Sequence, residues 1–137
     1  MNKPLPFWLV LVVIIEIVPM FVFPVLATLV PSAAPGLSGG EKFAFAAAIY
    51  SARNLAVGTG LLIALWLRDR AMLFILIMVR LVTDLVDFPI LLMLGEVSNV
   101  YMVSSIFVFL YYVPAIFALR YLWQQLILAR ASASAYE

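Results

Sequence analysis

Apolar and polar positions alternate along this chain on the scale of whole membrane spans. Four apolar runs, each bounded by polar or turn-forming residues, cover about residues 7–30, 43–67, 71–94 and 100–119. A helix needs about 20 consecutive apolar residues to cross the roughly 30 Å hydrocarbon core of a bilayer, and each run reaches that length. The pattern therefore predicts an all-α integral membrane protein in the form of a four-helix bundle.

The breaks between the runs are short and rich in turn-forming residues. Pro31, Pro35 and three glycines separate the first two runs, and the polar turn 68–70 separates the second from the third. The first run is longer than the core of a secretory signal, which is about 7–15 residues, so we interpret it as a retained helix. We expect one transmembrane domain over residues 1–137, with a cytoplasmic tail over 120–137 that begins as a helical extension near the membrane surface.

Composition supports this class and excludes several others. Hydrophobic residues make up 67% of the chain and charged residues 11%. A formal net charge of +1 provides no basic face for nucleic acid, so we expect no nucleic-acid partner. The chain has no Cys and no His, which excludes disulfides and imidazole catalysis and removes the usual zinc and haem ligands. We therefore expect no metal and no cofactor, and any chemistry must use carboxyl, guanidinium, amide and hydroxyl groups.

The distribution of basic residues predicts the orientation. With four crossings, the N-terminus, the turn 68–70 and the C-terminal tail share one side of the membrane, and that side carries most of the Lys and Arg outside the runs. Only Lys42 lies on the other side, whereas the shared side holds Lys3, Arg68, Arg70, Arg120 and Arg130. The positive-inside rule then places both termini in the cytoplasm, in a cell inner membrane.

Charged residues near the middle of the apolar runs are the strongest functional signal. One Arg, Lys or Asp at the centre of a membrane helix costs roughly 2.5–3.5 kcal/mol, so such residues usually face the bundle interior and mark a site. The candidates for catalysis are Glu16, Arg53, Arg80, Asp84 and Asp87.

Spacing and depth predict how these charges are paired. Arg80, Asp84 and Asp87 share one helix face at i, i+4 and i+7. Glu16 and Arg80 lie at similar depths in their runs, as do Arg53 and Asp84, which suggests two salt bridges. Arg80 can instead pair with Asp84 on its own helix, and Asp87 is then the candidate for an unpaired carboxyl. Because three carboxylates face two guanidiniums, we expect one carboxyl to carry a proton.

Other polar residues can complete a pocket around these charges. Tyr50 and Asn54 share a face of the second run with Arg53, and Ser105 and Tyr112 share a face of the fourth. We treat these four residues as candidate substrate-binding groups. Pro114 and prolines in the first and third runs predict helix kinks, for which structural reasons are more common than functional ones.

Small residues recur at every fourth position of the second run and form a ridge where another helix can approach closely. This ridge consists of Ala44, Ala48, Ala52, Ala56 and Gly60. It predicts tight helix packing, either within the monomer or in a homodimer.

The segment 51–87 combines Arg53 with Asn54, the glycines Gly58 and Gly60, the turn 68–70, and Arg80 with Asp84 or Asp87. With these residues the segment resembles the DoxX-like group of small four-helix membrane proteins. It implies a four-helix membrane bundle and no particular reaction. The chain also resembles the small multidrug resistance exporters in length, in span count and in having an acidic residue in the first helix, here Glu16, but the charges of the second and third runs depart from them.

Three functions are compatible with this pattern. The first is a membrane-embedded enzyme or binder that acts on a small lipophilic substrate by proton transfer, as in isomerisation, epoxide opening or cyclisation. Asp87 or Glu16 is then the acid, Asp84 the base, and the two arginines orient the carboxylates and stabilise developing negative charge. The second is a proton-coupled exporter, and the third is an accessory structural subunit whose charges form internal salt bridges.

Overall fold

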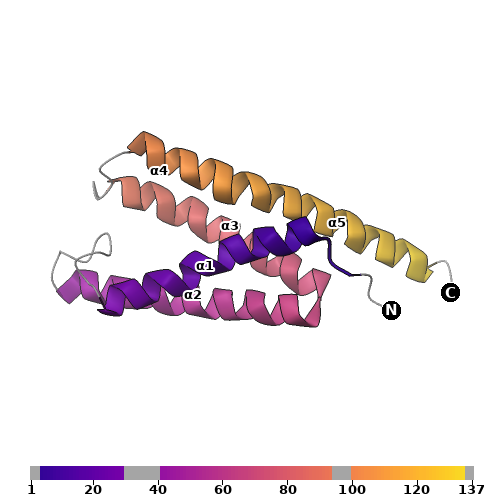
Figure 1. Ribbon diagram of the computed structural model, residues 1–137, viewed down its shortest axis with the longest axis horizontal. Helices are drawn as coiled ribbons and strands as arrows, with labels where there is room; N and C mark the ends of the chain where they lie inside the picture. Colours follow the sequence, from indigo (N-terminus) through magenta and orange to yellow (C-terminus); the bar gives the residue numbers. More distant parts are fainter. Residues whose placement is uncertain (1–3, 30–40, 94–99, 135–137) are drawn as a thin grey trace.

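The computed structural model of the chain describes residues 4–29, 41–93 and 100–134. Within these ranges the fold is all-α, as predicted. The helices are α1 (Phe7–Leu29), α2 (Glu41–Leu67), α3 (Arg70–Met93), α4 (Val100–Ile106), the π-helix η2 (Phe107–Tyr112) and α5 (Val113–Ser134). Because α4, η2 and α5 follow one another without a break, they form one rod, and the described chain is a bundle of four helices (Figure 1).

Three helices are long and apolar enough to cross a membrane. The segments are Phe7–Leu26, Ala48–Leu67 and Ser104–Ser132, and they fit a multi-pass membrane protein. Helix α3 is 24 residues long, which matches the length of a span, but it carries Arg80 near its middle and Asp84 and Asp87 in its second half. A crossing by α3 therefore remains a prediction that depends on how those charges are buried.

Helices that follow one another in the sequence run antiparallel, so the α2–α3 turn lies at the same end of the bundle as the start of α1 and the end of α5 (Figure 1). Figure 1 shows the start of α1, the end of α2, the start of α3 and the end of α5 at the same end, which we call the turn end. Helix α1 packs against α2, α3 packs against both α2 and α5, and α1 also contacts α5. The start of α1 and the end of α5 therefore lie at the same end of the bundle (Figure 1), while the predicted orientation in the membrane stays a prediction.

The turn between α2 and α3 is tightly specified. Arg68 adopts a left-handed conformation with φ 53°, and the backbone N–H groups of Arg68 and Asp69 donate to the carbonyls of Leu65 and Ala64. This pattern is a Schellman motif, whose left-handed position is usually Gly. Asp69 then caps α3, because its Oδ1 accepts hydrogen bonds from the N–H groups of Ala71 and Met72 at 2.9 and 3.1 Å. The polar turn predicted at 68–70 is therefore a C-cap followed directly by an N-cap.

The buried apolar core occupies only the half of the bundle nearer the turn end. Its members come from all four helices: Leu9, Val13, Ile17, Met20, Leu61, Ala64, Leu73, Ile77, Ala115, Ala118, Leu119 and Leu122. In the other half, which we call the far half (21–29, 41–53, 85–93 and 100–112), Pro24 is the one buried residue among those whose exposure is described. The bundle is thus closely packed near the turn end and loosely packed beyond the level of the charged residues.

The predicted ridge of small residues is not a packing face within the monomer. Ala48, Ala52 and Ala56 are exposed, and the side chain of Ala44 lies outside the described residues. Only Gly60 lies against a neighbouring helix, at Leu76 of α3. The close approach of α1 to α2 occurs instead at Gly58, on the face that also carries Asn54. The homodimer through the ridge stays a prediction.

Gly58→Ala is expected to destabilise the bundle, whereas Gly60→Ala is not. A Cβ at residue 58 would lie 3.0 Å from Phe21 and 3.1 Å from the Cβ of Met20, which cannot move without α1. We expect a loss of about 1–3 kcal/mol in the free energy of unfolding. At residue 60 the nearest atoms are the mobile methyl groups of Leu76, and Ala gains helix propensity over Gly. Unfolding by a denaturing detergent in mixed micelles measures both, and equal effects would contradict this packing.

The rod changes helical geometry before Pro114 and does not end at residue 119. Residues 107–112 are π-helical, and the N–H of Val113 donates to the carbonyl of Val108, five residues back. Since proline clashes with the carbonyl four residues earlier, a wider turn at this place is a reasonable accommodation. Beyond the predicted end of the fourth run, Leu122 is fully buried and the helix continues in line to Ser134 (Figure 1).

Candidate functional site

The charged stripe of α3 faces the interior of the bundle. Arg80 and Asp84 are buried, and Asp87 is half-buried. The exposed face of α3 carries apolar residues such as Val82, Leu85 and Val86 instead. A helix that turns its charges inward and its aliphatic side chains outward is the arrangement expected of a membrane span with a polar site.

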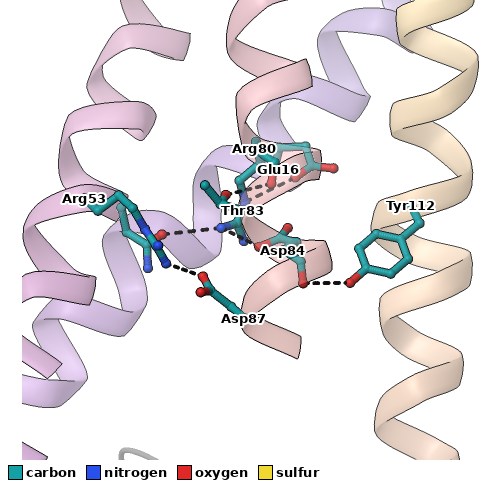
Figure 2. Close-up of polar contacts among 8 residues, drawn as sticks. Glu16, Arg53, Arg80, Thr83, Asp84, Asp87 and Tyr112 are labelled. Carbon is teal, nitrogen blue, oxygen red and sulfur yellow. Dashed lines mark hydrogen bonds and ion pairs between the residues drawn. The ribbon is translucent and has the colours of Figure 1, made fainter. Parts of the chain in front are cut away.

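Four polar residues from three helices form what we call the inner network: Glu16, Asn54, Arg80 and Asp84. Figure 2 labels three of them, Glu16, Arg80 and Asp84. Arg80 is its centre, with Nη1 2.6 Å from Oδ1 of Asp84 and Nε 3.8 Å from Oε2 of Glu16. Its Nη1 also donates to Oδ1 of Asn54 at 3.4 Å. All four residues are between 2% and 6% exposed. The predicted pair Glu16–Arg80 is confirmed, and so is the alternative contact of Arg80 with Asp84 on its own helix.

The inner network is incompletely hydrogen-bonded. Oε2 of Glu16 and Nε of Arg80 are buried and have no hydrogen-bond partner among the described residues. One guanidinium also faces two carboxyl groups, so full ionisation would leave an excess negative charge away from water. Burial penalises such a charge strongly. The excess carboxyl in the inner network fits the prediction that one carboxyl carries a proton, which stays a prediction.

A second ion pair, which we call the outer pair, joins Arg53 of α2 to Asp87 of α3 (Figure 2). Its side chains are 38% and 24% exposed, in contrast to the buried inner network. The guanidinium of Arg53 also lies over the ring of Tyr50, 5.1 Å from its centroid, and Tyr50 contacts Phe23 of α1 edge to face at 4.9 Å. Tyr50 thus lies beside the outer pair, as expected for a candidate binding residue.

The outer pair corrects two predictions. Arg53 pairs with Asp87 and not with Asp84, and Asp87 is not the unpaired carboxyl. Helical side chains lean toward the N-terminus of their own helix, and α2 and α3 are antiparallel. Arg53 therefore leans away from the turn end while Asp87 leans toward it, so the two meet, and Asp84 is already held by Arg80.

The rod contributes only part of what was expected of the fourth run. The hydroxyl of Tyr112 donates to the backbone carbonyl of Asp84 at 3.1 Å, so this residue joins the site (Figure 2). Ser105 does not, because it is exposed and donates to the carbonyl of Tyr101 on its own helix at 2.8 Å. A serine in a membrane helix can satisfy its hydroxyl in this way, and periodicity alone cannot distinguish that from a role in a pocket.

The site also contains residues that were not singled out as binding groups. The hydroxyl of Thr83 donates to the carbonyl of Arg80 at 2.8 Å, within the charged stripe. In the far half, Phe107 stacks on Phe88 of α3 at 4.6 Å and also contacts Tyr111 and Tyr112. The i, i+4 spacing of Phe107 and Tyr111 is a signal for such a cluster, but spacing within one helix cannot predict the stacking of Phe107 on Phe88 of α3.

Metal binding is not indicated by the described residues. Within 4–29, 41–93 and 100–134, no group of three or more Asp or Glu side chains gathers closely enough to hold a metal ion. The carboxyl groups are arranged around guanidiniums instead, as ion pairs.

Comparisons with known proteins assign this chain to no family, so its class is described by its fold and its site alone. No protein-family model matches the chain, and no curated protein or solved structure matches it. The chain is a helical protein with candidate transmembrane helices and a buried cluster of salt bridges. The resemblance of residues 51–87 to DoxX-like proteins stays a prediction.

Proposed function

We propose that this protein binds a small lipophilic molecule in the far half of its bundle and transfers protons to or from it. The observation that carries the proposal is the contrast between the two halves. Close packing of apolar side chains ends at the inner network, and beyond it an accessible ion pair lies between helices with little buried apolar surface. Sites within helical bundles are built in this way, with a few polar groups in an apolar surround.

The exposure of the two charge clusters assigns them different roles. Asp87 and Arg53 are accessible enough to contact a ligand, so Asp87 is the proposed proton donor or acceptor and Arg53 the group that orients it. Glu16, Asn54 and Asp84 are too deeply buried for direct contact. They support the site by fixing Arg80 and by holding the extra proton one helical turn from Asp87.

The ligand class follows from the surroundings of the outer pair. Tyr50 contacts Arg53 and in turn packs against Phe23, and elsewhere in the far half Phe88 of α3 stacks on Phe107 of the rod. Such surfaces fit an apolar molecule, and the guanidinium and carboxyl of the outer pair fit one polar, hydrogen-bonding group on it. Isomerisation, epoxide opening and cyclisation all begin with a proton transfer to or from such a group.

Asp87→Asn is expected to abolish ligand retention without loss of folded protein. Protein purified in mild detergent is extracted with organic solvent, and co-purifying small molecules are quantified by mass spectrometry. We expect a discrete lipophilic species with the wild type and at least about tenfold less with Asp87→Asn and Arg53→Gln, because a buried ligand group loses its charged partner. Ser105→Ala, an exposed control on the rod, should retain the ligand. Equal recovery from all four proteins would refute the proposal.

One observation favours the accessory-subunit alternative. The ridge residues Ala48, Ala52 and Ala56 are exposed, and small residues on a membrane helix are the usual surface for contact with another helix. That function predicts a wild-type protein that co-purifies with no small molecule and aggregates when extracted without its partner. The exporter alternative predicts flux across liposomes driven by a proton gradient and lost in Asp87→Asn.

A further inference from the structure

A pocket at the turn end, away from the charge clusters, has a lining suited to a lipid. Its volume is about 230 Å³, and it lies between the segment that leads into α1 and the last turns of α2. Its lining residues are Pro4, Leu5, Val10, Leu65 and Arg68. Four of the five are apolar and the fifth carries a guanidinium. The volume is below the roughly 300–1,000 Å³ of sites for drug-sized ligands, so the pocket suits part of a chain and not a whole amphiphile.

The electrostatics of this end favour an anion. The described residues at the turn end include Arg68, Arg70, Arg120 and Arg130, against the single carboxylate of Asp69. That carboxylate already accepts the hydrogen bonds that cap α3. Arg70 contacts Gln125, whereas Arg68 is exposed at the pocket. A guanidinium in this position presents a planar set of donors that suits a phosphate group.

The backbone at Arg68 gives independent support. Its φ of 53° is the left-handed conformation in which Gly is strain-free and other residues are not. An arginine in this position makes the turn less stable than a glycine would. Strained positions of this kind cluster at binding sites, and here the strain directs a cation to the rim of an apolar pocket.

We propose that this pocket binds an anionic glycerophospholipid, with its phosphate on Arg68 and part of one acyl chain against Leu5, Val10 and Leu65. Exposed indoles at the same end of the bundle support a position at headgroup depth, since Trp8 and Trp66 lie at the turn-end termini of α1 and α2. Basic residues at the cytoplasmic surface attract anionic lipids. A soluble anion would use the guanidinium and leave the apolar lining without a role.

Native mass spectrometry of the protein in non-ionic detergent, with added phosphatidylglycerol or phosphatidylcholine, tests the site. We expect the wild type to retain one phosphatidylglycerol in preference to phosphatidylcholine. Arg68→Gly and Arg68→Gln should weaken that binding about fivefold, which corresponds to the loss of one basic contact at a membrane surface. Arg120→Gln, an exposed arginine at the same end, is the matched control and should change it less than about twofold.

Thermal unfolding without lipid separates binding from folding. Arg68→Gly should unfold at the same temperature as the wild type or a higher one, because Gly relieves the left-handed strain, while its affinity for phosphatidylglycerol falls. Leu65→Trp should lower the affinity by filling the pocket. Equal retention of the two lipids by the wild type, equal loss in Arg68→Gln and Arg120→Gln, or displacement of the lipid by millimolar inorganic phosphate would each overturn the proposal.

Discussion

Arg80→Met is expected to lower the free energy of unfolding by about 3–5 kcal/mol, a large fraction of the stability of a typical domain. The guanidinium of Arg80 lies between the carboxyls of Glu16 and Asp84, and it also donates to Asn54. Its removal leaves these groups buried without a cation. The free energy of unfolding in mixed micelles measures the effect, and Arg120→Met, an exposed arginine, should change it by less than about 0.5 kcal/mol.

Neutralising the partners should restore much of that loss. In the triple variant Glu16→Gln, Arg80→Met, Asp84→Asn no charge remains in the inner network, so the desolvation penalty falls and the apolar methionine can pack. We expect the triple variant to be more stable than Arg80→Met alone. If the triple variant is instead the less stable of the two, the carboxyls contribute through hydrogen bonds and not through charge balance.

Leu73→Ala should cost about 2 kcal/mol or more, whereas Leu85→Ala on the same helix should cost almost nothing. Leu73 is fully buried in the core near the turn end, and Leu85 is exposed in the far half. Between membrane helices the energy comes mainly from packing contacts, so the cavity left at residue 73 is the main loss. Both variants have the same change in composition and helix propensity, which makes them a matched pair.

The same denaturing-detergent titration measures this pair. A large effect at residue 73 and a small one at residue 85 would support the observed rotation of α3, with Leu73 in the buried core and Leu85 on the outward face. Similar losses at the two positions would mean that Leu85 is packed against another helix, and α3 would then be rotated differently from the structure described.

The helices and their polar faces were predictable from the sequence because length and periodicity determine them. The four runs correspond to the four helical rods, and the i, i+4, i+7 stripe of α3 turns inward. Depth counted from the helix ends also placed Glu16 beside Arg80. Each of these predictions needs only the periodicity of a single helix, or a comparison of the depths of two residues in two helices.

Side-chain direction and helix rotation were not predictable in the same way. Arg53 reaches Asp87 because long side chains on antiparallel helices lean in opposite directions, which a count of heights ignores. The small-residue ridge of α2 is a strong packing signal, yet α1 approaches at Gly58. The widened turns of η2 follow from Pro114 together with its neighbours, and the sequence shows only the proline.

The π-helix changes how α4 is rotated about the axis of the rod relative to α5. Because its turns are wider than those of an α-helix, α4 faces its surroundings from a different azimuth than an uninterrupted α-helix would give it. Helix α5, which packs on the core, and helix α4, in the far half, can therefore turn different faces toward the other helices while the chain remains one continuous helix. A continuous helix thereby joins the buried core near the turn end to the more exposed far half without a loop between them.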